Sequence, residues 1–165
     1  MIRVCGKIDV AVICTIINDS AQAYRGVIPA DRWHEPYMPL DELKREIAAG
    51  VEFLGYQEDT GLVGVMGTQL VKDVMLIRHA YVRMTRRREG IGSALLTACL
   101  ERSEAPVLIG TWAAATWAID FYRKHGFSVI DGEKKYRVLD IYWSIPERQI
   151  ETSVVLADQR WRKRT

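Results

Sequence analysis

The spacing of apolar side chains near the start of the chain predicts one strand and two helices. Residues 2–5 form a short apolar run that is typical of a strand. Residues 9–24 carry apolar side chains every three or four positions, which is the period of a helix with one buried face. Residues 41–49 predict a second helix, which ends at Gly50.

The middle of the chain predicts strands joined by tight turns. Residues 51–57, 62–71 and 74–82 have the apolar character of strands. The segments between them, Asp59-Thr60-Gly61 and Lys72-Asp73, have the composition of turns. We therefore expect three neighbouring strands that pair as an antiparallel meander.

The second half of the chain alternates helices with strands. The expected elements are a helix from Gly90 to Arg102, a strand at 107–110, a helix at 116–125, a strand at 127–130, a helix at 133–143 and a last strand at 150–157. The basic end at residues 160–165 is expected to fray in solvent. The order βααβββαβαβαβ predicts an α/β fold, with a mixed sheet of about seven strands and helices on both faces, in a single domain over residues 1–165.

Composition and charge narrow the range of functions. Lys and Arg number 23 against 21 Asp and Glu, so a net charge of +2 gives no strong attraction to nucleic acid or membrane. The three cysteines are far apart and lack the Cys-x-x-Cys spacing of zinc and redox sites, which favours a reducing cytoplasmic location and no metal. A signal peptide over the apolar run 10–17 is an alternative, but Asp9 and the helical period favour a core helix.

The most informative segment lies between the strand that ends at Val82 and the helix that follows. Its sequence is Arg87-Arg88-Glu89-Gly90-Ile91-Gly92-Ser93. The backbone amides of such a loop bind anions such as pyrophosphate, and its glycines let the anion approach closely. The Gly-Lys-Ser/Thr ending of a Walker loop is absent, and Leu95 stands where a dinucleotide-binding loop has its third glycine. The segment predicts a phosphate loop that is not typical of nucleoside triphosphates or NAD.

Residues 87–92 match the pattern Gln/Arg-x-x-Gly-x-Gly/Ala, and on this pattern the chain resembles the GNAT superfamily of acyl-CoA-dependent N-acetyltransferases. Tyr81-Val82 resembles the end of the family's fourth strand, and residues 118–127 resemble the end of its fourth helix. The resemblance is close over residues 74–130. It implies a GNAT-like fold and an enzyme that transfers an acetyl group from acetyl-CoA to a primary amine, and it is compatible with a homodimer.

The resemblance also implies the residues of the site. The pantetheine and acyl group are expected on the backbone of Ala80, Tyr81 and Val82. The pyrophosphate is expected on the backbone of Arg87, Arg88, Glu89, Gly90, Ile91, Gly92 and Ser93. Tyr122 matches the family's usual general acid, which protonates the departing CoA thiolate.

Two positions depart from the family pattern. Ala115 stands where many members have Asn, with Thr116 as a substitute hydrogen-bonding group, and Leu76 stands where some members have a glutamate base. His79, Glu151 or an ordered water is then left to accept the amine proton. These departures motivate an alternative function, a non-catalytic acyl-CoA sensor or partner-interaction module.

Several of these side chains also have structural interpretations. For Tyr122 the alternative to a catalytic role is a packed aromatic residue, and Ser93 is also typical of a helix cap. The arginines at 86–88 suit a solvated cluster or a nucleic-acid patch, but beside a phosphate loop we interpret them as attracting the acidic cofactor. Five further residues are candidates to border an acceptor pocket, with core packing as the alternative: Tyr24, Trp33, Trp112, Trp143 and Arg148.

Overall fold

A computed structural model describes residues 1–164 and places seven strands of that range in one mixed sheet, in the order β1-β2-β3-β4-β5-β7-β6. The pairing of β4 with β5 is parallel and the other pairings are antiparallel. The strands are β1 (Ile2–Val4), β2 (Glu52–Glu58), β3 (Gly61–Val71), β4 (Val74–Val82), β5 (Val107–Trp112), β6 (Ser128–Ile130) and β7 (Ser153–Ala157). The predicted mixed α/β sheet is confirmed.

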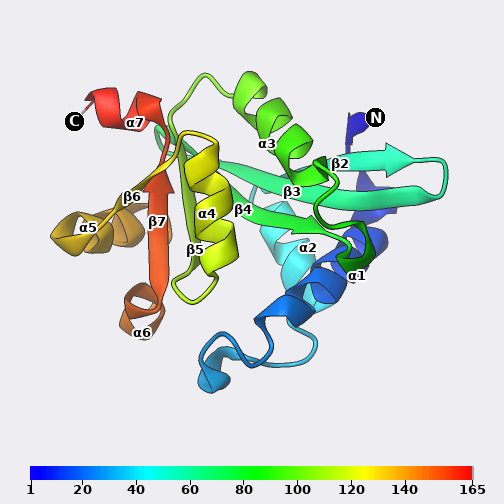
Figure 1. Cartoon of the computed structure of the whole chain (residues 1–165), viewed down its shortest axis with the longest axis horizontal. Coiled ribbons are helices and arrows are strands. Elements are labelled where there is room, and N and C mark those ends of the chain that lie inside the picture. The colour runs from blue at the N-terminus through cyan, green and yellow to red at the C-terminus, as the bar shows by residue number, and fades with distance from the viewer. Residues whose placement is uncertain (165) are drawn as a thin grey trace.

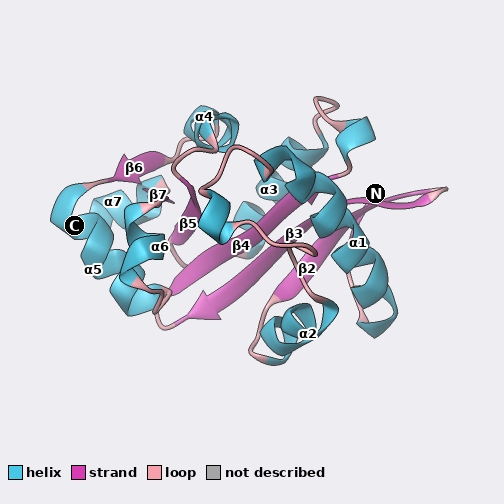
Figure 2. Cartoon of the chain, turned by 90° about the horizontal axis from the view of Figure 1, so that it is seen from below, coloured by secondary structure: helices cyan, strands magenta, loops and turns pink. Residues whose placement is uncertain are grey.

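Helices cover both faces of this sheet (Figures 1 and 2). The α-helices are α1 (Val10–Ala21), α2 (Leu40–Ala48), α3 (Ile91–Arg102), α4 (Thr116–Lys124), α5 (Gly132–Tyr142), α6 (Glu147–Glu151) and α7 (Gln159–Arg164). Short 3-10 turns occupy Lys7–Asp9, Gln22–Tyr24, Ala30–Arg32 and Met84–Arg86. The apolar side chains of α3 and α4 pack on one face of the sheet, and those of α1, α2 and α5 pack on the other.

The alternation of side chains along β4 decides which residues face which layer of helices. Ala80 and Val82 belong with the core under α3, whereas Tyr81 packs with the core under α1 and α2. A bulge interrupts this alternation at Arg78, because Gly67 pairs with His79 while the next residue of β3 pairs with Ile77.

β4 and β5 separate after a short stretch of pairing. Their register covers only residues 75–77 of β4 and 107–109 of β5, although β4 continues to Val82 and β5 continues to Trp112. Residues 78–82 and 110–112 therefore bound a gap in the ladder, which we call the β4–β5 opening. The backbone of Ala80, Tyr81 and Val82 lies along it.

Two predictions near the C-terminus are wrong. The last strand begins at Ser153 rather than residue 150, because the turn of α6 starts after Pro146, whose carbonyl accepts a hydrogen bond of 3.1 Å from the amide of Ile150. Residues 159–164 form α7 instead of fraying. The Asp158 carboxylate accepts a hydrogen bond from the amide of Trp161 at 3.1 Å, which stabilises the first turn. Residue 165 lies outside the described range.

A buried carboxylate ties β1 to the start of α1. The Arg3 guanidinium donates two hydrogen bonds to Asp9, at 2.8 and 2.9 Å, and the amide of Gly6 donates a third at 2.7 Å. The bonds from Arg3, followed by the bond from Gly6, hold the pKa of Asp9 at about 2 against the opposing effect of burial.

Because the folded pKa of Asp9 lies below its unfolded value, this stabilisation is present at neutral pH and is lost as the pH falls from about 4 toward about 2. We expect Asp9→Asn to lower the free energy of unfolding at pH 7 by about 1–2 kcal/mol. Urea unfolding at pH 7 and pH 3 measures the effect. The difference between wild type and variant should shrink at the lower pH, and an equal difference at both would contradict this assignment.

Candidate functional site

The loop after β4 presents a run of free backbone amides. Arg88 and Gly90 have φ angles of 65° and 80°, in the left-handed region. Within residues 1–164, no backbone amide from 87 to 93 donates a hydrogen bond to another protein group; the amide of Ala94 is the first to do so, to the Gly90 carbonyl at 3.0 Å. A row of free amides at the N-terminus of a twelve-residue helix is an anion-binding arrangement.

Ion pairs fix this loop to the rest of the sheet. Arg86 contacts Glu58 at the end of β2 at 2.6 Å and Glu89 within the loop at 2.7 Å. In contrast, the exposed side chains of Arg87 and Arg88 take part in no ion pair among the described residues. The loop is therefore held in place while two cationic side chains stay available to an anionic ligand.

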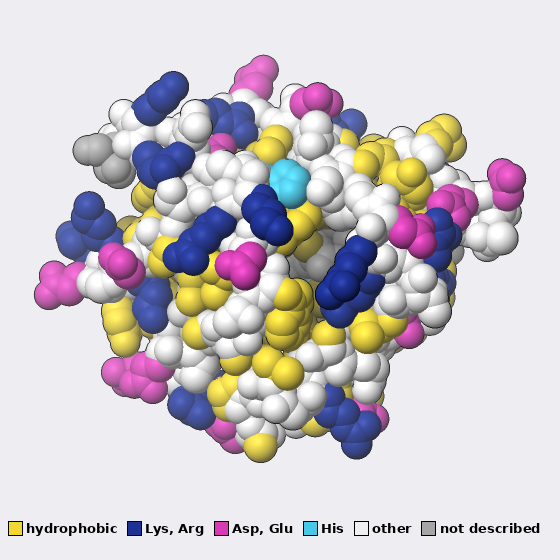
Figure 3. Space-filling view, in the orientation of Figure 1, with side chains coloured by type: hydrophobic (Ala, Val, Ile, Leu, Met, Phe, Trp, Pro, Cys, Tyr) yellow, Lys and Arg dark blue, Asp and Glu magenta, His cyan; other side chains and the backbone are white. Residues whose placement is uncertain are grey.

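Close packing brings the phosphate loop, the end of β4 and α4 together. A Cβ atom on Gly64 of β3 would lie 2.9 Å from Ile91 Cγ2 and 3.4 Å from Val82 Cγ2, so only glycine permits this approach. A Cβ on Gly92 would lie 3.5 Å from the ring of Phe121 in α4. In the space-filling view the surface is hollowed between α4 and the end of β4, with Lys and Arg side chains on the rim (Figure 3). The structure thus brings the expected cofactor-binding residues to one place.

Tyr122 follows Phe121 in α4 and is almost fully buried. Its side chain packs against Phe127, with ring centroids 5.9 Å apart. Its hydroxyl has no hydrogen-bond partner within residues 1–164. Among those residues, the side-chain polar atom that is both unpartnered and closed off from solvent is Arg32 Nε, so the Tyr122 oxygen retains some contact with solvent. Burial raises the pKa of Tyr122, and the neighbouring Tyr24 and Cys99 raise it further. The phenol therefore stays protonated at neutral pH and can donate a proton.

An aromatic cluster lies beside the β4–β5 opening. Tyr24 contacts Tyr37 and Tyr81, with ring centroids 5.5 and 6.4 Å apart, and it stacks on Trp117 of α4 at 6.0 Å. Trp112 Nε1, at the end of β5, donates a hydrogen bond of 2.9 Å to the Tyr37 hydroxyl. Burial raises the pKa of Tyr24 to about 12. The cluster joins both strands of the opening to α4 and to the α1–α2 connection.

Three of the five predicted acceptor-pocket residues belong to this cluster. Tyr24 and Trp112 contact Tyr37 directly, and the ring of Trp33 stacks on Tyr37 at 5.8 Å. The other two make no ring contact with the cluster among the described residues. Trp143 packs in the core under α5, against Gly110 of β5, and Arg148 of α6 pairs with Asp31 at 3.2 Å. Sequence reasoning did not include Tyr37 or Trp117 in the pocket. Tyr37 lies in a connection without regular periodicity, and Trp117 reaches the cluster through its contact with the distant Tyr24.

The candidate bases have very different surroundings. His79 is buried, and its Nε2 lies 2.5 Å from Glu46 Oε2 of α2, a partner that no local sequence pattern indicates. Burial acts to raise the pKa of Glu46, but the hydrogen bond and charge of His79, together with Arg78, outweigh it and lower that pKa. Glu151 is exposed at the end of α6.

The two departures from the family pattern are both buried apolar positions. Leu76 is fully buried in the core under α5. An apolar side chain therefore packs at the position where some members of the family have a charged glutamate. Ala115 is fully buried at the start of α4. Ala115 is the N-cap of this helix and has no polar side chain to cap it, and Thr116 is the first residue of α4.

No group of three or more His, Cys, Asp or Glu side chains within residues 1–164 is arranged to hold a metal ion. Among the helices of the described chain, none is long and apolar enough to cross a membrane.

Comparison with solved structures shows the same fold in known acetyltransferases. The PaiA N-acetyltransferase of Thermoplasma acidophilum, solved with coenzyme A, superposes with a TM-score of 0.69 at 16% identity, over 96% of this chain and 97% of that one. The ribosomal-protein-S18-alanine N-acetyltransferase of Escherichia coli gives 0.67 at 16% identity, over 96% and 92%. A GNAT acetyltransferase of Elizabethkingia anophelis with acetyl-CoA bound gives 0.55 at 21% identity, over 71% and 81%.

Comparison with curated proteins finds no match. The family model described as "Acetyltransferase (GNAT) domain" matches residues 18–139, which include the phosphate loop, the β4–β5 opening and Tyr122. The chain therefore belongs to the GNAT family of acetyltransferases.

Proposed function

We propose that this protein transfers an acetyl group from acetyl-CoA to a primary amine. The observation that carries the proposal is the row of free amides at residues 87–93, which lies beside a gap between two sheet strands and next to the unpaired side chains of Arg87 and Arg88. The solved relatives that contain coenzyme A or acetyl-CoA support the same donor.

In this proposal the donor lies along the end of β4. The pyrophosphate accepts hydrogen bonds from the amides of residues 87–93, and the two arginines add attraction for its charge. The pantetheine arm enters the β4–β5 opening along the backbone of Ala80, Tyr81 and Val82, where β4 has no partner strand on that side. The thioester then lies between the end of β4 and α4.

The reaction proceeds by direct attack of the amine on the thioester. The amine nitrogen forms a bond to the thioester carbon, and the backbone amide near Val82 stabilises the charge that develops on the carbonyl oxygen. When the intermediate collapses, the carbon–sulfur bond breaks and the thiolate takes a proton from Tyr122. The Tyr122 phenolate recovers a proton from solvent, to which its oxygen retains access.

The proton lost by the amine passes to water in the opening. Of the side chains considered for this step, His79 is engaged with Glu46 and buried, and Glu151 is exposed on α6. A buried imidazole held by a carboxylate at 2.5 Å stabilises the packing of β4 on α2. The acceptor is expected against the cluster of Tyr24, Tyr37 and Tyr81, which borders the same opening.

Release of free CoA thiol in the presence of candidate acceptors tests this function. The acceptor panel consists of a polyamine, an aminoglycoside, a peptide with a free N-terminus and a lysine-rich protein. At least one acceptor should give release that depends on both substrates, with the acetylated amine identified by mass spectrometry. Saturable acetyl-CoA binding with no transfer to any member would instead support the non-catalytic acyl-CoA sensor.

A further inference from the structure

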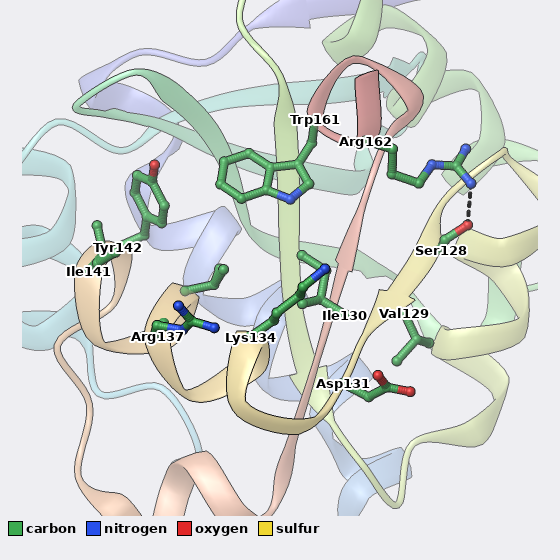
Figure 4. Close-up of a pocket in the computed structure, with 11 residues that line it drawn as sticks. Ser128, Val129, Ile130, Asp131, Lys134, Arg137, Ile141, Tyr142, Trp161 and Arg162 are labelled. Atoms are coloured by element: carbon green, nitrogen blue, oxygen red, sulfur yellow. Dashed lines mark hydrogen bonds between the residues drawn. The ribbon is translucent and has the colours of Figure 1, made fainter. Parts of the chain in front are cut away.

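A cavity lies away from the phosphate loop and the β4–β5 opening, between β6, α5 and α7. Its volume is about 450 Å³, which is within the range of small-ligand sites. None of the residues that line it belongs to the phosphate loop, the end of β4 or the aromatic cluster. Figure 4 shows Trp161 of α7 on one side and Lys134 and Arg137 of α5 on the other. We call this cavity the α5–α7 pocket.

The apolar wall of the pocket is held in place by several contacts. Trp161 packs edge-on against Tyr142 of α5, with ring centroids 6.0 Å apart. The Tyr142 hydroxyl donates a hydrogen bond of 2.9 Å to Asp73, which also pairs with Arg164 of α7. Asp73 therefore joins both helices to the β3–β4 turn. The rest of the wall is aliphatic and comes from Val129, Ile130, Val138 and Ile141.

The charges that line the pocket are mostly positive. Lys134, Arg137 and Arg162 contribute three cations, against the single carboxylate of Asp131. Arg162 is engaged with Ser128 and the Gly126 carbonyl. Lys134 and Arg137 take part in no hydrogen bond or ion pair within residues 1–164, although both line the cavity. Two unpaired cations beside an aromatic and aliphatic wall are complementary to an acid with an apolar body.

We propose that the α5–α7 pocket binds a small organic acid. Its carboxylate pairs with Lys134 and Arg137, and its apolar body lies against Trp161 and the aliphatic wall. The indole N–H of Trp161 has no acceptor among the described residues and is available to the ligand as a further donor. An inorganic anion would leave the apolar wall unused, and a neutral aromatic molecule would leave both cations unpaired.

Calorimetric titration with 1-naphthoate tests the proposal on the full chain. Excess coenzyme A is present throughout to occupy the donor site, and 1-naphthamide serves as the uncharged analogue. Lys134→Glu and Arg137→Glu reverse the two free charges, while Arg137→Lys keeps the charge. Lys44→Glu on α2 is the matched control, because Lys44 is also exposed and in no ion pair among residues 1–164.

We expect wild type to bind 1-naphthoate at one saturable site, about tenfold more tightly than 1-naphthamide. Each charge reversal should weaken binding about tenfold or more, whereas Lys44→Glu should bind as wild type and Arg137→Lys should retain most of the affinity. No saturable binding by wild type, or equal affinity in both reversal variants and wild type, would overturn the proposal. A third outcome would also overturn it: wild type binds no naphthoate, and the mass measured by sedimentation is lower for Lys134→Glu than for wild type. The pocket would then be an interface between copies of the chain.

Discussion

Replacing Tyr122 with Phe should lower kcat for acetyl transfer by about 10²–10³-fold and leave the Kd for acetyl-CoA unchanged. The substitution removes only the hydroxyl, whose oxygen has no hydrogen-bond partner within residues 1–164. The ring keeps its contacts with Phe121 and Phe127, so the packing of α4 is preserved. The departing thiolate would lose its proton donor, and initial rates with calorimetric Kd values would separate this effect from binding.

Tyr136→Phe is the matched control for this experiment. Tyr136 lies in α5, and 42% of its surface is exposed, so the same loss of a hydroxyl there should leave kcat unchanged. If Tyr122→Phe retained wild-type kcat, Tyr122 would be a packing residue and the proposed proton transfer would be wrong. A weaker Kd for acetyl-CoA with unchanged kcat would also remove it from the chemical step.

Replacing Gly90 with Asp should weaken acetyl-CoA binding by more than about 100-fold. Gly90 lies in the middle of the free amides, with a φ of 80°, and no atom lies within 4 Å of the position that a Cβ would take there. A carboxylate at this point would place negative charge in the site that receives the pyrophosphate. Calorimetric titration of wild type and variant with acetyl-CoA measures the loss.

Two further variants separate charge from backbone strain. Gly26→Asp introduces the same residue at a φ of 75°, again with open space around it, in the α1–α2 connection. It should cost about 1–2 kcal/mol of stability and leave acetyl-CoA binding intact. Gly90→Ala introduces strain without charge and should lose far less affinity than Gly90→Asp. Equal affinity in Gly90→Asp and wild type would place the pyrophosphate elsewhere.

Local patterns predict most of the fold because its longer elements show a clear period and end at turn residues. The helical period over residues 9–24 and the turn residues around Gly61 and Asp73 agree closely with the observed α1, β3 and β4. The prediction fails at residues 150–152 and 159–164, where α6 and α7 depend on Pro146 and on the Asp158 carboxylate. Such short helices carry too few residues to show a period.

The candidate site divides in the same way between local and distant contacts. The phosphate loop is local, because its amides and the helix that follows come from consecutive residues. The pairing of His79 with Glu46 joins residues on β4 and α2, and the contact of Tyr37 with Trp112 joins the α1–α2 connection to β5. These contacts exist only after the sheet has formed, so no sequence spacing indicates them.

The central claim is that acetyl-CoA lies in the β4–β5 opening with its pyrophosphate on the free amides. Titration of isotope-labelled protein with acetyl-CoA, followed through backbone amide chemical shifts, tests it directly. We expect saturable shifts that are largest at residues 80–82 and 87–93. Among the described residues, the amides of the phosphate loop at 87–93 donate to no protein acceptor. No saturable change, or changes centred on another part of the chain such as the α5–α7 pocket, would contradict the claim.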